Sequence, residues 1–187
     1  MTKERIILGI DPGTQLLGFG IIRVDAKGPH YLTMGVFDLR KIDDPFERLT
    51  NIHAGISELI EVYHPTDMAI EAPFLGKNAQ SMLKLGRAQG AAIIAGTTRG
   101  IPVTEYAPTK AKIAICGSGS ASKEQVATMV CKTLNVELKP EHFDATDALA
   151  IALCHHYQLA SPLTASSRGS ANSWKAFIQN NPDRIKK

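Results

Sequence analysis

The sequence predicts an α/β fold in which a mixed five-stranded sheet is flanked by helices. The first observation is a run of three strand-like segments, at residues 5–10, 18–24 and 31–39, separated by turn residues. The second is that helical and strand-like segments alternate after them, as they do where parallel strands are joined by crossover helices. Three hairpin-linked strands followed by crossovers imply a sheet with both antiparallel and parallel pairs.

The remaining elements follow from the spacing of apolar residues. A helix at 45–63 is indicated by Leu49, Ile52, Ile56 and Ile60, which share one helical face. The pair His64-Pro65 ends this helix. Further helices are expected at residues 78–98, 109–115, 122–134 and 144–159, and two more strands at 67–71 and 100–106. These segments supply five strands and enough helices to cover both faces of the sheet.

Composition indicates a single globular domain. The chain has 187 residues, of which 44% are hydrophobic and 21% charged, and no apolar run reaches the roughly 18 residues that a membrane span needs. The first residues lack the apolar stretch of a signal peptide, so we expect a cytoplasmic protein. Three widely spaced cysteines argue against a disulfide framework or a cysteine-based zinc site and are expected to be reduced core residues. We expect one domain over residues 1–160 and a flexible basic tail over 161–187.

The net charge of +3 is unevenly distributed along the chain. Residues 72–123 contain seven Lys and Arg against Glu105 alone, and residues 161–187 contain five against Asp183 alone. The rest of the chain is therefore acidic. A basic segment with acidic flanks is typical of a polyanion-binding surface beside an acidic metal site, although solvated helix faces explain the charge pattern alone equally well.

Two acidic residues end predicted strands. Asp11 follows the first apolar strand and precedes a Pro12-Gly13 turn, and Glu71 ends the fourth strand before Pro73. In open α/β sheets, ligands bind beyond the carboxyl ends of neighbouring strands. For either acid alone, an exit of the strand to solvent is the simpler interpretation.

The last predicted helix carries two further acids. Asp144, Asp147, Ile151 and Cys154 are spaced by three, four and three residues and therefore share one stripe. Since the apolar part of the stripe must face the sheet, both aspartates should face inward. The alternative is helix capping, with Asp144 as the N-cap and Asp147 at the third helical position.

Considered together, the four acids favour a metal site. Convergent carboxylates repel one another, and a divalent cation removes that repulsion. Oxygen ligands without an accompanying cysteine favour Mg²⁺ or Mn²⁺ over zinc. Two such ions are typical of enzymes that hydrolyse phosphodiesters, and the adjacent basic segment indicates a nucleic-acid substrate.

Several motifs carry a more specific signal, because their order, identity and spacing agree together. They are GIDPGT at 9–14, AIE at 69–71 with Phe74 and Lys77-Asn78, LKLGR at 83–87, YAP at 106–108 and DATDALA at 144–150. With these motifs the sequence resembles the RuvC-type Holliday-junction resolvases, which have an RNase H-like (retroviral-integrase-like) fold. The similarity covers residues 6 to about 156 and leaves out the tail.

The resemblance implies a homodimeric, Mg²⁺-dependent endonuclease that resolves four-way DNA junctions in recombination and repair. It would cut two strands of like polarity symmetrically and work with the RuvA–RuvB branch-migration complex. Asp11, Glu71, Asp144 and Asp147 match the family's four metal-binding carboxylates, which would hold two Mg²⁺ ions per subunit, with Mn²⁺ as a substitute. Phe74 matches a base-stacking aromatic, and Lys112 and Lys123 match basic positions near the active site. The full set expected to bind DNA is Phe74, Lys77, Lys84, Arg87, Lys112 and Lys123.

Structural interpretations remain open for some of these residues. Phe74 also suits a core position after a strand, and Lys112 and Lys123 also suit a solvated surface. The family's third carboxylate position is sometimes histidine, but His142 is interpreted as a loop residue. Consecutive Cys154, His155 and His156 point in different directions on a helix, so we expect helix-end positions rather than a metal site.

Three other functions compete with the endonuclease. The turn at 11–14 is also similar to the phosphate loop of sugar kinases and Hsp70-like ATPases, but those proteins close two such domains around the nucleotide and this chain is too short. A nuclease of the same fold could act on structured RNA. A junction-binding protein with a vestigial site would not be expected to keep all four carboxylates.

Overall fold

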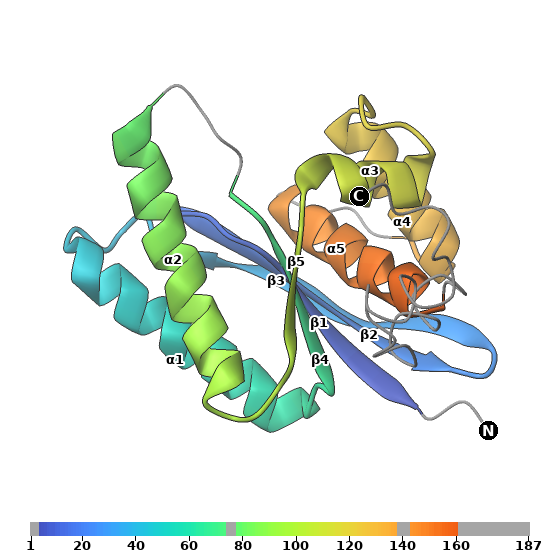
Figure 1. Ribbon diagram of the computed structural model, residues 1–187, viewed down its shortest axis with the longest axis horizontal. Coiled ribbons are helices and arrows are strands. Elements are labelled where there is room, and N and C mark those ends of the chain that lie inside the picture. Colours follow the sequence, from blue (N-terminus) through green and yellow to red (C-terminus); the bar gives the residue numbers. More distant parts are fainter. Residues whose placement is uncertain (1–3, 74–77, 138–142, 161–187) are drawn as a thin grey trace, which may run out of the picture. The chain divides into compact units, whose positions relative to one another are not determined.

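The computed structural model describes residues 4–73, 78–137 and 143–160. They form the predicted mixed five-stranded sheet, in the order β3-β2-β1-β4-β5 (Figure 1). The strands are β1 (Arg5–Asp11), β2 (Leu16–Asp25), β3 (Gly28–Asp38), β4 (Asp67–Glu71) and β5 (Val103–Tyr106). β1 pairs antiparallel with β2, and β2 with β3, whereas β1 and β4, and β4 and β5, are parallel. The predicted fold class is therefore confirmed.

Side-chain caps mark the start of several helices. The Asp44 side chain accepts hydrogen bonds from the first amides of its helix, and Ser122 and Gln125 form a reciprocal capping box. His64 and Asn135 end helices in the left-handed conformation. The helices are α1 (Pro45–Tyr63), α2 (Ala79–Thr97), α3 (Pro108–Cys116), α4 (Lys123–Leu134) and α5 (Phe143–Ala160).

Helices cover both faces of the sheet and enclose two apolar cores. Alternate residues of β1 face opposite sides, so Ile7 joins one core while Leu8 and Ile10 join the other. The core that contains Leu8 and Ile10 also contains buried residues of α1 and α2. The core that contains Ile7 is built with α3, α4 and α5 (Figure 1). Successive residues of β1 therefore pack alternately against the helices on one face of the sheet and those on the other.

Helix α5 lies unusually close to β1 and β2 because glycines face it. A Cβ atom on Gly9 would lie 2.1 Å from the Ala148 carbonyl oxygen, and one on Gly18 would lie 2.0 Å from the Asp144 carbonyl oxygen. Gly9 and Gly20 are paired across the two strands, and a Cβ atom on Gly20 would meet Leu149 at 2.7 Å. These glycines allow the helix backbone to contact the sheet backbone, which fixes the height of α5 above the sheet.

Some boundaries differ from the predictions. β5 begins at Val103 rather than at residue 100, because Gly100 adopts a positive φ of 72° in the turn before it. α5 begins at Phe143, so Asp144 lies in the first helical turn and not at the N-cap, which makes the capping interpretation of Asp144 wrong. The three cysteines are free, as expected, but of these only Cys154 is buried.

A compact unit spans Met1–His156, and a second unit spans Tyr157–Lys187, of which the structure describes only the end of α5. The predicted flexible tail at 161–187 lies outside the described residues. Among the helices in the described part of the chain, none combines the length and apolar character needed to cross a membrane.

Candidate active site

Asp11 and Glu71 occupy the same end of two adjacent parallel strands. Ile10 of β1 is in register with Ile70 of β4, so the acid that follows each of them ends its strand at the same edge of the sheet. Asp11 is two residues beyond Gly9, which faces α5, and strand alternation therefore directs Asp11 to the same side. The sheet thus presents both carboxylates to the layer formed by α3, α4 and α5.

The first turn of α5 brings two more carboxylates to this edge. Gly18 is paired with Asp11 across β1 and β2, and the Asp144 backbone rests directly on Gly18. Asp147 follows one helical turn later and faces the sheet. A cavity of about 220 Å³ at this position is lined by Asp11, Glu71, Pro108, Ala111, Lys112, Lys123, Val126, Asp147 and Ala150. Residues more than 130 positions apart in the sequence therefore share one cavity.

Burial and nearby carboxylates make Asp11, Glu71 and Asp147 hard to ionise. Burial raises the pKa of Asp11 to about 8, with further increases from Glu71, Asp147 and Asp144. Burial also raises the pKa of Glu71 to about 7, and the Asp147 charge adds to the increase. The pKa of Asp147 is raised by burial as well, although Lys123 opposes the shift. Burial and the neighbouring carboxylates thus both oppose ionisation, a condition that a bound cation would relieve.

Lys123 supplies part of that positive charge from the chain itself. Its Nζ lies 2.9 Å from Asp147 Oδ2 and 3.7 Å from Asp144 Oδ1. Within the described ranges, no three His, Cys, Asp or Glu side chains are placed so that they could together hold one metal ion. The donors are nevertheless the carboxylate oxygens that Mg²⁺ prefers, and a divalent cation would offset the repulsion that neighbouring carboxylates exert on Asp11 and Glu71. The chemistry of the residues therefore fits such an ion.

Comparison with known proteins identifies the family. The family model for the crossover junction endodeoxyribonuclease RuvC matches residues 7–155. The RuvC protein of Bacteroides fragilis is 51% identical over 186 residues, which cover 98% of this chain and 97% of that protein. The RuvC protein of Porphyromonas gingivalis is 50% identical over 187 residues, with 98% of each chain covered. The chain belongs to the RuvC family.

A solved structure agrees with this assignment. Thermus thermophilus RuvC, determined in complex with a Holliday junction substrate, matches with a TM-score of 0.77 and 35% identity. The match covers 83% of this chain and 94% of that one. The RuvC fold therefore extends over the sheet and the helices described above.

The structure separates the basic residues that were predicted to bind DNA. Lys112 and Lys123 line the carboxylate cavity. Lys84 and Arg87 instead line a different cavity of about 290 Å³, together with Thr14 and Arg48 near the start of α1. Phe74, Lys77 and His142 lie outside the described residues. Of the six predicted DNA-binding residues, the structure thus brings two to the carboxylates and places two elsewhere.

Sequence reasoning missed a buried polar network on the same face of the sheet. It joins Asp67, His155 and Tyr106; His155 lies in the last turns of α5, as predicted, but it is buried, which the sequence analysis did not predict. Burial raises the pKa of Tyr106 to about 12, so its hydroxyl keeps its proton. One signal was available: Asp67 opens an apolar strand, and a buried acid needs a partner.

Proposed function

We propose that this RuvC-family protein is an endonuclease that resolves four-way DNA junctions by hydrolysing phosphodiesters. The observation that carries the proposal is the convergence of Asp11, Glu71, Asp144 and Asp147 from β1, β4 and α5 beside two lysines. The names of the relatives and the Holliday junction substrate bound by the Thermus protein support the same substrate for this chain. Symmetric cuts in two strands of like polarity would leave ends that can be joined directly.

The proposed cofactor is Mg²⁺, two ions per subunit, with Mn²⁺ as a substitute. Asp11, Glu71, Asp144 and Asp147 would hold the ions, and the raised pKa values of Asp11 and Glu71 support binding of positive charge there. When bound, such a pair supplies an activated water and stabilises the leaving oxygen. In this proposal the chain's own contribution is a rigid frame: β1 and β4 fix two carboxylates, and the close contact of Gly18 with α5 fixes the other two.

Two lysines are proposed to act on the phosphate. Lys112 and Lys123 line the cavity, and Lys123 Nζ lies 2.9 Å from Asp147 Oδ2. When divalent cations hold the carboxylates, the Lys123 ammonium would bind a phosphate oxygen and stabilise its developing negative charge. We retain Phe74 as a base-stacking residue and Lys77, Lys84 and Arg87 as phosphate contacts along the DNA arms.

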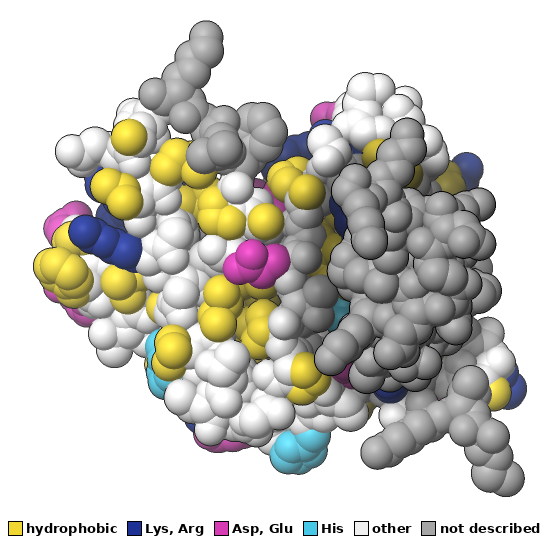
Figure 2. Space-filling view, viewed as in Figure 1, with side chains coloured by type: hydrophobic (Ala, Val, Ile, Leu, Met, Phe, Trp, Pro, Cys, Tyr) yellow, Lys and Arg dark blue, Asp and Glu magenta, His cyan; other side chains and the backbone are white. Residues whose placement is uncertain are grey.

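A homodimer is proposed because a pair of symmetric cuts needs two active sites related by a dyad. Helix α2 supplies a suitable surface. Leu83 and Ile94 are 64% and 53% exposed, and between them Gly86 and Gly90 continue the same stripe with open space where a Cβ would lie. Hydrophobic side chains are visible at the surface along α2 in Figure 2. Glycines flanked by large apolar residues allow a second α2 helix to approach closely.

The proposal extends to the domain organisation, the cellular location and the partner of the protein. We propose residues 1–160 as the nuclease domain and 161–187 as a basic tail that adds DNA affinity. We also propose that the protein acts in the cytoplasm, with a branch-migration complex of the RuvA–RuvB type as its partner.

A cleavage assay tests the proposed function. A synthetic four-way junction, a linear duplex of the same sequence and a structured RNA are each incubated with the protein, with Mg²⁺ or with EDTA. We expect paired nicks in the junction, only with Mg²⁺, and no cleavage of the other two. Cleavage of the RNA instead would favour the alternative nuclease, whereas junction binding without cleavage would favour a binding protein. ATP binding, measured by calorimetry, would support the kinase-like alternative.

A further inference from the structure

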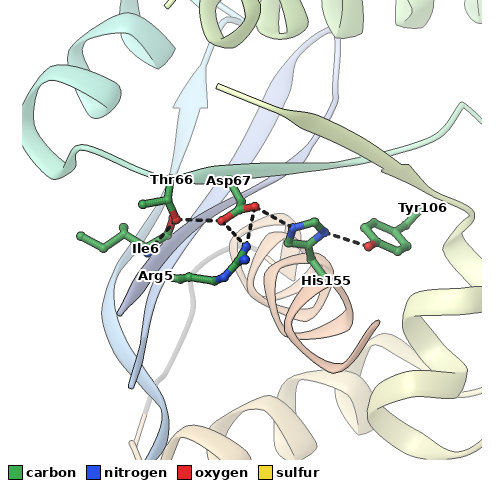
Figure 3. Close-up of polar contacts among 6 residues, drawn as sticks. All are labelled: Arg5, Ile6, Thr66, Asp67, Tyr106 and His155. Carbon is green, nitrogen blue, oxygen red and sulfur yellow. Dashed lines mark hydrogen bonds and ion pairs between the residues drawn. The ribbon is translucent and has the colours of Figure 1, made fainter. Parts of the chain in front are cut away.

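A buried polar network lies under α5 on the same face of the sheet as the carboxylates (Figure 3). Its Arg5 and Asp67 lie at the opposite end of β1 and β4 from the carboxylates, whereas Tyr106 is paired with Glu71 at the end of β5, and its side chain reaches back to His155. The Tyr106 hydroxyl lies 2.8 Å from His155 Nδ1, and His155 Nε2 lies 3.6 Å from Asp67 Oδ1. Arg5 Nη1 donates to both oxygens of Asp67 at 3.0 Å, and the Thr66 hydroxyl lies 2.7 Å from Asp67 Oδ2. Four elements, β1, β4, β5 and α5, are thereby tied together.

The proton arrangement of His155 follows from its neighbours. The Asp67 carboxylate is ionised, with its pKa lowered to about 2, and can only accept, so the His155 nitrogen that faces it, Nε2, carries a proton. In the neutral tautomer Nδ1 is then the acceptor, and the Tyr106 hydroxyl donates to it. The hydrogen bond with Tyr106 is therefore directional and fixes the His155 ring with respect to β5, whereas His155 Nε2 faces Asp67 of β4 at 3.6 Å, beyond hydrogen-bond distance.

The elements that carry the carboxylates are the ones that this network joins. β1 carries Arg5 and Asp11, and β4 carries Asp67 and Glu71. On α5, His155 follows Asp144 by eleven residues, which is close to three helical turns, so both face the sheet about 16 Å apart along the axis. Each of these three elements therefore has one end in the network and the other in the carboxylate site.

Between the two ends, the contact of α5 with β1 is made by small residues. Gly9 faces Ala148 and Ala152, and these atoms touch without hydrogen bonds. This contact fixes the height of the helix without a hydrogen bond along its axis, and larger side chains of α5 such as Leu149 pack into the same core. The hydrogen bond between Tyr106 and His155 adds a directional restraint along the axis, since a shift of 1 Å breaks a hydrogen bond of 2.8 Å.

We propose that Tyr106 and His155 are positioning residues that hold α5 in register, so that Asp144 and Asp147 stay aligned with Asp11 and Glu71. This inference rests on the proposed function of the carboxylate site as a metal-dependent nuclease centre. It assigns a functional role to buried residues that do not touch the substrate or the ions.

The test uses the full-length protein and Tyr106→Phe, which removes one oxygen and keeps the ring. We expect the Mn²⁺ dissociation constant, measured by calorimetry without DNA, to rise about tenfold, as for other residues that orient metal ligands indirectly. The single-turnover cleavage rate at a fixed, subsaturating Mn²⁺ concentration should fall by a similar factor, while junction affinity in EDTA stays within about twofold because phosphate contacts supply it. Tyr63→Phe, on the opposite face of the sheet, is the matched control and should change none of these values.

A second pair of variants separates positioning from folding. His155→Asn keeps an acceptor for Tyr106 and should bind Mn²⁺ more tightly than His155→Ala. Equal Mn²⁺ affinity in the wild type and Tyr106→Phe would overturn the proposal even if the variant melted at a lower temperature, and so would an equal loss in Tyr63→Phe. If the wild type bound Mn²⁺ but did not cut junctions, the proposed function would fail, while the Mn²⁺ comparison would still decide this inference.

Discussion

The ammonium group of Lys123 lies 2.9 Å from Oδ2 of Asp147, which means that the acidic cavity contains a cation of its own. This side chain comes from the first turn of α4, more than twenty residues before Asp147 in the sequence. It partly offsets the repulsion among the carboxylates, and it must give up this contact if divalent ions take its place.

Replacing this lysine should therefore affect the metal-free protein and the metal-bound protein differently. In Lys123→Met we expect the metal-free protein to lose about 0.5 kcal/mol of stability, since Lys123 is half-exposed and such pairs contribute little. The rise in melting temperature on adding Mg²⁺ should become larger than in the wild type, because no internal cation competes. Differential scanning fluorimetry across a Mg²⁺ series measures both effects. Lys112→Met is the control, since Lys112 lines the same cavity but forms no ion pair within 4 Å among the described residues, and an identical response in both variants would refute the competition.

Asp11→Asn should separate activity from stability. The amide keeps the size of the side chain but cannot serve as an anionic ligand, so we expect cleavage to fall by about 10³-fold or more, equivalent to several kcal/mol of lost transition-state stabilisation. The metal-free protein should become more stable at pH 8, because a buried charge beside other carboxylates is removed. Junction affinity should stay largely unchanged. Cleavage at the wild-type rate with Mg²⁺ would show that Asp11 has no role in the reaction.

The same carboxylates predict a pH dependence of stability. The folded-state pKa values of Asp11 and Glu71, about 8 and about 7, lie above ordinary carboxyl values, so the folded protein binds more protons than the unfolded chain between about pH 4 and 8. The stability that these groups contribute is fully present below about pH 4 and is lost as the pH rises toward 8. We expect the melting temperature of Asp11→Asn in EDTA to exceed that of the wild type by an amount that grows from pH 5 to pH 8. A constant difference across this range would contradict the raised pKa.

Gly18→Ala should weaken metal binding and stability although it changes none of the carboxylate residues. Its Cβ would lie 2.0 Å from the Asp144 carbonyl oxygen, so the start of α5 must move away from β2. We expect a loss of about 1 to 3 kcal/mol in unfolding free energy, measured by urea denaturation, together with weaker Mn²⁺ binding. Gly119→Ala is the control, since its Cβ would meet ordinary contacts at 3.7 Å. Unchanged stability in Gly18→Ala would mean that the contact between β2 and α5 is softer than the structure indicates.

The proposed dimer surface on α2 can be tested with charges. Leu83→Asp and Ile94→Asp alter exposed side chains, so the monomer should fold normally while the dimer dissociation constant rises at least about tenfold for each substitution. Analytical ultracentrifugation at micromolar concentration measures this change. Val62→Asp on α1 is the control, because Val62 is similarly exposed. A wild-type protein that stays monomeric on junction DNA would rule out the dimer.

Much of this architecture is encoded locally and was therefore predictable. The spacing of Ile52, Ile56 and Ile60 predicted α1, and the Pro-Gly turn after Asp11 predicted where β1 ends. The convergence of Asp11 and Glu71 followed from a general rule about strand ends, because both strands are parallel neighbours. The family resemblance then supplied the reaction class, which the spacing of acids alone leaves open.

Other features depend on contacts between distant segments, which no local pattern encodes. The pairing of Lys123 with Asp147 requires the packing of α4 against α5, and the link between Tyr106 and His155 spans 49 residues. The separation of Arg87 from Lys112 depends on which face of the sheet each helix covers. His155 was misjudged because neighbouring helical residues normally point to different surroundings, whereas nearly the whole of this part of α5 is enclosed.

The facing pair Gly9 and Gly20 has a consequence for protein engineering. Both residues lie beneath α5. Even one added methyl group at either position would therefore push the helix away from the sheet. A mutagenesis library aimed at new substrate specificity should therefore keep both glycines constant and place its diversity in the solvent-facing residues of α3 and α4. Substitutions there can change the shape of the cavity opening without displacing α5 from the sheet.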